Sequence, residues 1–391
     1  MGDLFQNIKI PKIFYVDGKT YIMTRKGSSF IYEKGENIKK YALLKNRLVI
    51  NRNCRVIKQN NNLQDAEAKI ISALTTNVSL ISKEQYLSEK NKVYTTNKIE
   101  ASIIIPCKNE GENLENTIES ILNSYNNTRF EIIVINDSLD DTCTNFINKD
   151  NDRYDEVTVL NTENLGCAAA KNAGAAASKG EFLLFVDAHV EVSDYWIDLL
   201  VNTIKNRKVD AVVPAISDFI KTKELGYGET YNNQLSLKWL KDKPKDIMDI
   251  PIACGCVFAI KKVLFNSLNG FQKLLSVWGR EDEELSIKLW LYGYRVVVNP
   301  AIAVKHRFRK TFPYEVVNAS IIYNTLVLAY IHFNNTRIGK VINLLKGKEG
   351  YNDAVQLVKE NFNLIFEVRK EYLSERIHDD DYFFEKFKID F

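Results

Sequence analysis

The chain has 391 residues, of which 45% are hydrophobic and 26% charged, the composition of an ordinary globular protein. The formal net charge of +3 is too small for this length to indicate a nucleic-acid partner, so any anion must be recognised locally. The length allows one large domain with appendages, or two domains.

The sequence contains no pattern that indicates secretion or a membrane span. No basic-then-apolar segment at the N-terminus has the form of a signal peptide. The longest apolar stretch, residues 316–333, is interrupted by polar side chains and predicts a buried helix. The six cysteines include no zinc-type pair, and Cys254 and Cys256 are too close in the chain for an ordinary structural disulfide. We therefore expect free thiols in a reducing compartment and a cytoplasmic protein.

Residues 1–97 are predicted to form an accessory, β-rich N-terminal region. Short β-prone runs, separated by turn residues, occupy positions 12–16, 20–24, 29–32 and 48–50. A more polar stretch, from position 63 to about 87, is predicted to be helical. No motif with evident chemistry falls in this region.

Residues 98–315 alternate strands with helices, which indicates an α/β domain with a mostly parallel sheet. Predicted strands cover 101–106, 131–135, 157–160 and 210–214, and another ends at residue 186. A helix with Leu114, Ile118, Ile121 and Leu122 on one face follows the first strand. Small residues at 167–177 predict a helix that packs closely against the sheet or a ligand. Residues 316–391 are predicted to form a helical C-terminal extension.

Polar side chains follow three of the predicted strands, where ligands bind in open α/β sheets. They are Asn109 and Glu110 after the first strand, Asp137 after the second, and Asp187 and His189 after the strand that ends at 186. Each cluster alone fits a turn or a helix cap equally well. Together they outline a pocket with hydrogen-bond acceptors for a base and a ribose.

Asp187, His189 and the distant His306 form a candidate metal site. One carboxylate and two imidazoles can hold a divalent ion and leave positions open for a ligand's oxygens. The chain has four histidines, and two of them fall in these segments.

These segments resemble the nucleotide-sugar half of the family 2 glycosyltransferases, which have the Rossmann-like GT-A fold. The resemblance rests on residues 103–110, 134–138, 164–174 and 185–189. Residues 251–260, 278–282 and 304–310 are similar to the corresponding segments of the polypeptide N-acetylgalactosaminyltransferases. Those enzymes also use Asp-x-His and a later His to bind Mn²⁺. The resemblance covers residues 100 to 315, and specifies neither the sugar nor the acceptor.

The resemblance implies a role for each matched residue. Pro106, Asn109 and Glu110 would line the nucleotide pocket, and Asp137 would bind uracil or ribose. Asp187, His189 and His306 would hold Mn²⁺ or Mg²⁺ against the diphosphate of a UDP-sugar. Further contacts to the donor are implied for Lys171, Asn172, Gly255, Trp278 and Arg309.

Several of these positions need comment. Lys171 and Asn172 stand where many relatives have Arg-Asn, which keeps the charge but loses the bidentate fork. Arg309 is expected to contact phosphate, and Arg307 and Lys310 to add charge or close as a lid. Gly255 is expected to lie beneath the sugar, where only a bare backbone fits. Trp278 would form the floor of the sugar or acceptor site, and the insertion around Trp239 would shape the acceptor cleft.

Glu281 and Asp282 open a predicted helix that Gly293 is placed to end. Carboxylates are favoured at a helix N-terminus, so capping is one interpretation, and it fits Glu283 and Glu284. In inverting relatives, the Asp of a Glu-Asp pair takes the proton from the acceptor hydroxyl. Retaining N-acetylgalactosaminyltransferases have Asn at the position of Asp282. We therefore favour inversion, with Asp282 as general base and Glu281 contacting donor or acceptor.

The sequence thus predicts a metal-dependent glycosyltransferase that moves a sugar from a UDP-sugar to a hydroxyl of a peptide, protein or glycan. A retaining polypeptide-type N-acetylhexosaminyltransferase is the nearest alternative. A nucleotidyltransferase would show a glycine-rich phosphate loop where this chain has residues 106–111. A nucleotide-sugar-binding scaffold without catalysis would be expected to lack Asp187 or Asp282.

Overall fold

In the computed structural model the chain forms two compact units, residues 1–97 and 98–391. The structure describes residues 98–138, 142–147, 152–309 and 311–391, together with five strands of the first unit. The predicted helix at 63–87 and Lys310 lie outside the described residues.

The described part of the first unit consists of strands. β1 (Lys12–Val16), β2 (Lys19–Thr24) and β3 (Ser29–Ile31) each pair with the other two. β4 (Tyr41–Leu44) and β5 (Arg47–Ile50) form an antiparallel hairpin. Four of these strands coincide with the predicted β-prone runs, whereas β4 was not predicted.

The second unit is built on one sheet, which contains ten described strands in the order β10-β17-β11-β16-β9-β6-β7-β8, with β12 beside β11 and β15 beside β17. The bounds of these strands are β6 Ala101–Cys107, β7 Phe130–Asn136, β8 Val157–Asn161, β9 Phe182–Val186, β10 Val190–Glu191, β11 Ala211–Asp218, β12 Leu225–Gly226, β15 Met248–Asp249, β16 Val257–Lys261 and β17 Val296–His306.

The sheet is mixed, so the expectation of mostly parallel strands holds for only half of it. β9, β6, β7 and β8 are parallel neighbours, as predicted. β16 enters between β9 and β11 and is antiparallel to both. The α6 helix (Lys262–Ser267) directly follows β16, and β16 itself follows the 254–256 loop. The antiparallel strand therefore brings this loop to the end of β9, beside Asp187.

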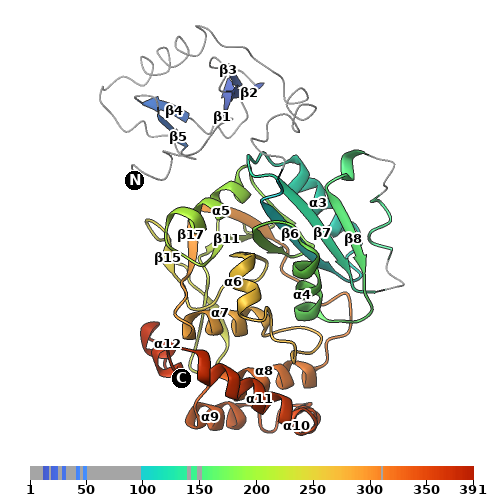
Figure 1. Ribbon diagram of the computed structural model, residues 1–391, viewed down its shortest axis with the longest axis vertical. Helices are drawn as coiled ribbons and strands as arrows, with labels where there is room; N and C mark the ends of the chain where they lie inside the picture. The colour runs from blue at the N-terminus through green and yellow to red at the C-terminus, as the bar shows by residue number, and fades with distance from the viewer. Residues whose placement is uncertain are drawn as a thin grey trace. The chain divides into compact units, whose positions relative to one another are not determined.

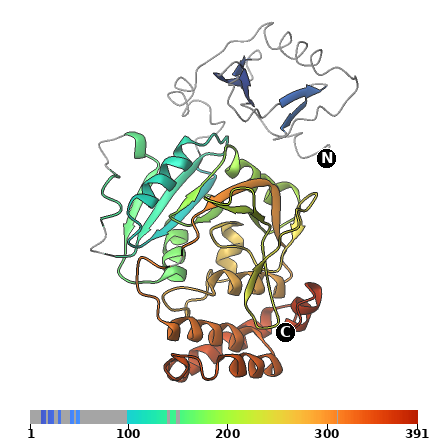
Figure 2. The same ribbon diagram turned by 180° about the vertical axis from the view of Figure 1, so that it is seen from behind.

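Strand residues alternate between two cores, because successive side chains point to opposite faces of a sheet. Ile103 and Ile105 of β6 pack with helices α3 (Glu112–Asn123) and α5 (Trp196–Asn206). Ile104 packs on the other face, with helices α4 (Cys167–Ala177) and α7 (Glu281–Leu291). Figures 1 and 2 show the two groups of helices on opposite sides of the strands.

The C-terminal helices pack in the core that contains Ile104. They are α8 Asn318–His332, α9 Asn335–Leu345, α10 Tyr351–Glu360, α11 Phe362–Glu375 and α12 Asp380–Lys386. Both views show them gathered beneath α6 and α7 (Figures 1 and 2). The apolar stretch at 316–333 is indeed a buried helix, α8. No described helix is long and apolar enough to cross a membrane.

The strand order places the site. β6 is the first strand of this sheet in the chain, yet it lies between β7 and β9. The chain continues from β6 to β7 and β8 on one side and then crosses to β9 on the other side, so the strand order reverses at β6. Ligands bind outside the carboxyl ends of the strands at such a point. The ends of β6 and β9 carry Glu110 and Asp187, respectively.

Candidate active site

A cavity of about 1000 Å³ opens at this edge of the sheet. Its walls come from the ends of β6 and β9, the starts of α4 and α7, the 254–256 loop, and residues 306–309 and 312–315. The predicted site residues Pro106, Asn109, Glu110, Asp137, Lys171, Asp187, His189, Gly255, Trp278, Glu281, Asp282, His306 and Arg309 all line it. Asn172 is the exception. Its side-chain amide donates to the carbonyl of Phe271 and accepts from the N–H of Phe271, both at 2.9 Å.

Asp187, His189 and His306 meet across two strand ends. β10 pairs with β17, and Val190 is the register partner of His306. One ligand atom from each of the three side chains lies within 4.8 Å of the others, and His306 Nε2 is 3.1 Å from Asp187 Oδ2. Burial opposes ionisation of Asp187, but the His306 hydrogen bond and the charges of both histidines keep the pKa of the carboxyl group below its usual value.

These three residues fit a divalent metal. The buried Nδ1 atoms of His189 and His306 have no hydrogen-bond partner among the described residues, although His189 Nδ1 is 3.4 Å from Glu110 Oε2. Neutral imidazoles are common metal ligands, and both of these rings have a nitrogen that no described residue satisfies. Two imidazoles and a carboxylate also form a donor set that suits Mn²⁺.

Glu110 connects Arg309 to the cluster of Asp187, His189 and His306. The Arg309 guanidinium pairs with the Glu110 carboxylate, with Nη1 3.1 Å from Oε1. Burial would raise the pKa of Glu110, but His189 and Arg309 lower it. Arg309 is thus held by a carboxylate rather than free in the cavity. The guanidinium of Arg307 lies instead over the Phe219 ring, 5.6 Å from its centroid.

Asp137 lines the cavity beside the loop that leads into α4. One of its oxygens accepts from Thr162 Oγ1 at 2.8 Å and from the Leu165 N–H at 2.7 Å, and the other accepts from the Gly166 N–H at 2.9 Å. The carboxylate therefore holds the loop that leads into α4. Asn109 connects the end of β6 to residues 312–315, since its amide donates to the Pro313 carbonyl at 3.3 Å.

Lys171 connects α4 to the start of α7. Its ammonium group is buried, 3.1 Å from Asp282 Oδ1 and 3.4 Å from Glu281 Oε1. Burial opposes the charged form of Lys171, but Asp282 and the other nearby negative groups outweigh it and raise its pKa. Burial raises the pKa of Asp282 to about 7, although Lys171 acts in the other direction. The exposed 31% of the Asp282 side chain borders the cavity.

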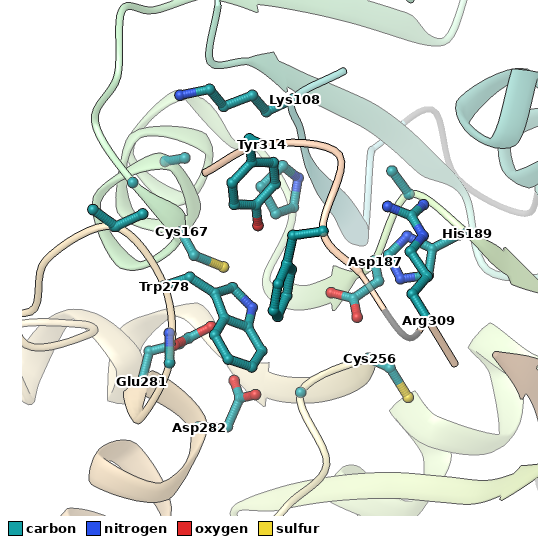
Figure 3. Close-up of a pocket in the computed structure, with 18 of the residues that line it drawn as sticks. Lys108, Cys167, Asp187, His189, Cys256, Trp278, Glu281, Asp282, Arg309 and Tyr314 are labelled. Carbon is teal, nitrogen blue, oxygen red and sulfur yellow. The ribbon is translucent and has the colours of Figure 1, made fainter. Parts of the chain in front are cut away.

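Figure 3 shows the carboxyl groups of Asp187 and Asp282 facing the same space, with Trp278 beside it. Trp278 packs against Phe312, with ring centroids 4.6 Å apart. Gly255 lies in the 254–256 loop, and its Cα approaches the Asp282 carboxylate so closely that a side chain would not fit. The sequence placed Gly255 beneath the sugar, whereas its tightest contact is with Asp282.

A buried asparagine fixes the loop that carries Trp278. Asn324 of α8 donates from Nδ2 to the carbonyls of Ser276, Trp278 and Gly279, at 2.8, 3.1 and 2.9 Å. Its Oδ1 accepts from the Ser276 N–H at 2.8 Å. The loop needs such support because Val277 has a φ of 53°, which is strained for a β-branched residue. The sequence gives one indication of this role, because Asn324 interrupts the apolar stretch at 316–333.

Glu283 and Glu284 are not helix caps, so the capping interpretation was wrong for both. Glu283 accepts from Tyr231 Oη at 2.7 Å and pairs with Arg280. Glu284 is fully buried, with His332 Nε2 at 2.9 Å and Lys288 Nζ at 3.3 Å. Carboxylates buried in this way need specific partners. The first turn of α7 is therefore connected separately to the 229–231 strand and to α8.

The comparisons with known proteins agree with this geometry. The glycosyl transferase family 2 model matches residues 102–268. This segment, which carries Glu110, Asp137, Asp187 and His189, is therefore similar to the family 2 glycosyltransferases. A second model, the N-terminal domain of galactosyltransferase, matches residues 242–311 and includes the start of α7 and His306.

Among curated relatives, the chain is similar to two polypeptide N-acetylgalactosaminyltransferases. Number 3 of Drosophila melanogaster is 30% identical over 253 residues, which are 58% of this chain and 37% of the relative. Number 10 of Rattus norvegicus is 30% identical over 247 residues, 58% of this chain and 40% of the relative. The chain thus spans about two fifths of the length of these relatives.

The fold of the chain also has a solved counterpart. A crystal structure described as GalNAc-T7 with UDP, GalNAc and Mn²⁺ superposes with a TM-score of 0.56 and 20% identity. The match covers 75% of this chain and 57% of that one. The α/β domain with a GT-A fold, predicted from the sequence, is confirmed.

Proposed function

We propose that this protein is a metal-dependent glycosyltransferase that uses a UDP-sugar donor. The observation that carries the proposal is the cavity that joins the Asp187, His189 and His306 cluster to Asp282. The similarity to polypeptide N-acetylgalactosaminyltransferases supports a nucleotide-sugar donor, and the likeness in fold to GalNAc-T7 with UDP and Mn²⁺ supports the choice of both nucleotide and ion.

Asp187, His189 and His306 would hold the ion, which supplies positive charge for the diphosphate of the leaving nucleotide. The base and ribose would lie against the walls formed by Pro106 and Asp137. The donor sugar would then extend towards α7, between Gly255 and Trp278. Arg309 lies within hydrogen-bonding reach of Glu110, so a phosphate contact requires that it exchange or share this partner.

We further propose that transfer proceeds with inversion and that Asp282 is the general base. The acceptor hydroxyl gives its proton to the Asp282 carboxylate while its oxygen bonds to the anomeric carbon of the sugar. The bond from that carbon to the diphosphate oxygen breaks, and UDP leaves. A base works best when its pKa is near the working pH, and the pKa of Asp282 is about 7. Lys171 orients the carboxylate, and Glu281 shares that lysine.

The acceptor class follows from the relatives. Polypeptide N-acetylgalactosaminyltransferases act on polypeptides, so we propose a hydroxyl of a peptide or protein, with a glycan as the alternative. The aromatic groups at Trp278, Phe308 and Phe312 are suited to packing against such an acceptor. We also retain a cytoplasmic location as a proposal, which cell fractionation with a compartment marker would test.

Retention of configuration is the second candidate, and the relatives favour it. The measurement that separates the two is the anomeric configuration of the transferred sugar, by NMR of the product. An anomer opposite to that of the donor supports inversion, whereas the donor's own anomer supports retention.

The experiment that tests the proposed function is UDP binding by calorimetry, with Mn²⁺ and then with excess chelator. We expect tight binding only with the metal. His306→Ala should leave the melting temperature nearly unchanged but weaken metal-assisted binding. His378→Ala is a matched control, because His378 stacks on Tyr382 away from the cavity. Full UDP affinity in chelator would overturn the proposal.

A further inference from the structure

The carboxyl group of Glu229 lines the cavity, and the proposed mechanism assigns it no role. Glu229 starts β13 (Glu229–Tyr231), which pairs with β14 (Leu237–Trp239). Its backbone also forms a bridge to Ile252, with N–H···O distances of 3.0 and 3.1 Å. Pairing on both edges fixes the backbone, so the side chain leaves from a rigid position.

The side chain faces α7. Alternate residues of a strand lie on the same face, and Tyr231, two positions on, donates its hydroxyl to Glu283 of α7. Glu229 itself lines the cavity. Its charge interacts with those of Glu283 and Asp282, which places it at the α7 end of the cavity.

Glu229 lacks the partners that its neighbours have. Glu281 and Asp282 share Lys171, and Glu283 has Arg280 and Tyr231. Within the described residues, the Glu229 carboxyl group has no hydrogen bond and no ion pair. Burial, together with the Glu283 and Asp282 charges, raises its pKa to about 8, so it is mostly a neutral acid at pH 7. A neutral carboxylic acid can donate one hydrogen bond and accept others.

We propose that Glu229 is a specificity residue that binds the donor sugar, through a hydrogen bond to a hydroxyl or acetamido group of the ring. Such groups are neutral, and they both donate and accept hydrogen bonds, which matches an uncharged acid without a partner. A sugar that reaches from a diphosphate at Asp187 towards Asp282 brings its distal hydroxyls to this end of the cavity. The inference rests on the proposed function, because it assumes a UDP-sugar in the cavity.

The test compares UDP with UDP-sugars in the full chain. Dissociation constants are measured with Mn²⁺ for UDP, UDP-glucose, UDP-galactose, UDP-GlcNAc and UDP-GalNAc. The ratio of the UDP constant to that of the tightest UDP-sugar gives the contribution of the sugar. We expect Glu229→Ala to reduce this ratio about 3- to 10-fold, as for one lost hydrogen bond. UDP alone should bind as in the wild type.

Two variants make the result specific. Glu229→Gln keeps the shape and the neutral hydrogen-bonding groups, so the ratio should stay within about twofold of the wild type. Glu229→Met fills the space without these groups and should behave like Glu229→Ala, which covers the case that the alanine variant does not fold. Glu224→Ala, an exposed change in the same segment, is the matched control.

The outcomes separate the two proposals. If UDP binds with Mn²⁺ but Glu229→Ala and Glu229→Met keep the wild-type ratio, or if the wild type gains nothing from any sugar, this inference is wrong and the proposed function stands. If UDP does not bind the wild type with Mn²⁺, the proposed function fails and the inference fails with it.

Discussion

The backbone of Gly255 lies directly against the carboxyl group of Asp282. A Cβ atom at position 255 would stand 1.9 Å from Asp282 Oδ2 and 2.0 Å from its Cγ, far inside van der Waals contact. Lys171 holds the same carboxylate from α4, at 3.1 Å. The proposed base is thus fixed from two sides, by a residue without a side chain and by a buried cation.

Gly255→Ala should therefore displace Asp282 and reduce transfer more than it reduces stability. Overpacking of this kind costs about 1–3 kcal/mol, and a misplaced catalytic group costs up to about 10²-fold in rate. Turnover and melting temperature of the purified variant measure the two effects. Gly339→Ala is the control, since a Cβ there meets no atom within 4 Å. Wild-type turnover in Gly255→Ala would show that the position of Asp282 is unimportant.

Asp282→Asn removes the proposed base while nearly preserving the shape of the side chain. We expect transfer to fall about 10²–10⁴-fold, with UDP and metal binding intact. Because Asp282 must be ionised to act and its pKa is about 7, the wild-type rate should decline as the pH falls below 7. The variant should lose this dependence. Near wild-type turnover would instead favour the retaining mechanism, and exposed Asp242→Asn is the control.

Asn324→Ala should loosen the loop that carries Trp278. The change leaves one buried and two partly buried carbonyls without this donor, at a cost of about 1–3 kcal/mol. We expect a lower melting temperature, an altered Trp fluorescence spectrum and weaker UDP-sugar binding. Asn318→Ala, at an exposed position of the same helix, should change none of them. An unaltered affinity for UDP-sugar would mean that the loop is held by other contacts.

Glu229→Gln should stabilise the protein at neutral and alkaline pH. The pKa of Glu229 is raised from 4.5 to about 8 on folding, so its contribution to stability is fully present below pH 4.5 and is lost as the pH rises towards 8. Glutamine does not titrate. The variant should match the wild type at pH 4.5 and exceed it by up to about 4 kcal/mol at pH 8, as urea denaturation would show. A constant difference across this range would contradict the assigned pKa.

The sequence predicted a site residue correctly where one short segment contains both a strand and the candidate metal-binding side chains that follow it. Asp187 and His189 directly follow an apolar strand, and their place at the sheet edge could be predicted from the period of the strands. Asn172 shows the limit of this reasoning. It lies next to Lys171, but it bonds the backbone of Phe271, 99 positions later in the chain, so adjacency in the sequence did not place it in the cavity.

Partnerships across long separations could not be predicted. Lys171 and Asp282 are 111 positions apart, and nothing local to either residue indicates the other. Glu229 and Asn324 looked like ordinary polar residues in a loop and a helix. Their roles depend on the antiparallel insertion of β16 and on the packing of α8 beneath α7, which hydrophobic periodicity does not determine.

The most direct test of the central claim is release of UDP from a panel of UDP-sugars, measured with Mn²⁺ and with excess chelator. We expect at least one UDP-sugar to be cleaved, by hydrolysis or by transfer to a hydroxyl acceptor, only when the metal is present. We also expect Asp187→Ala to abolish the reaction. Cleavage that continues in chelator, or no binding and no cleavage of any UDP-sugar with Mn²⁺, would contradict this claim.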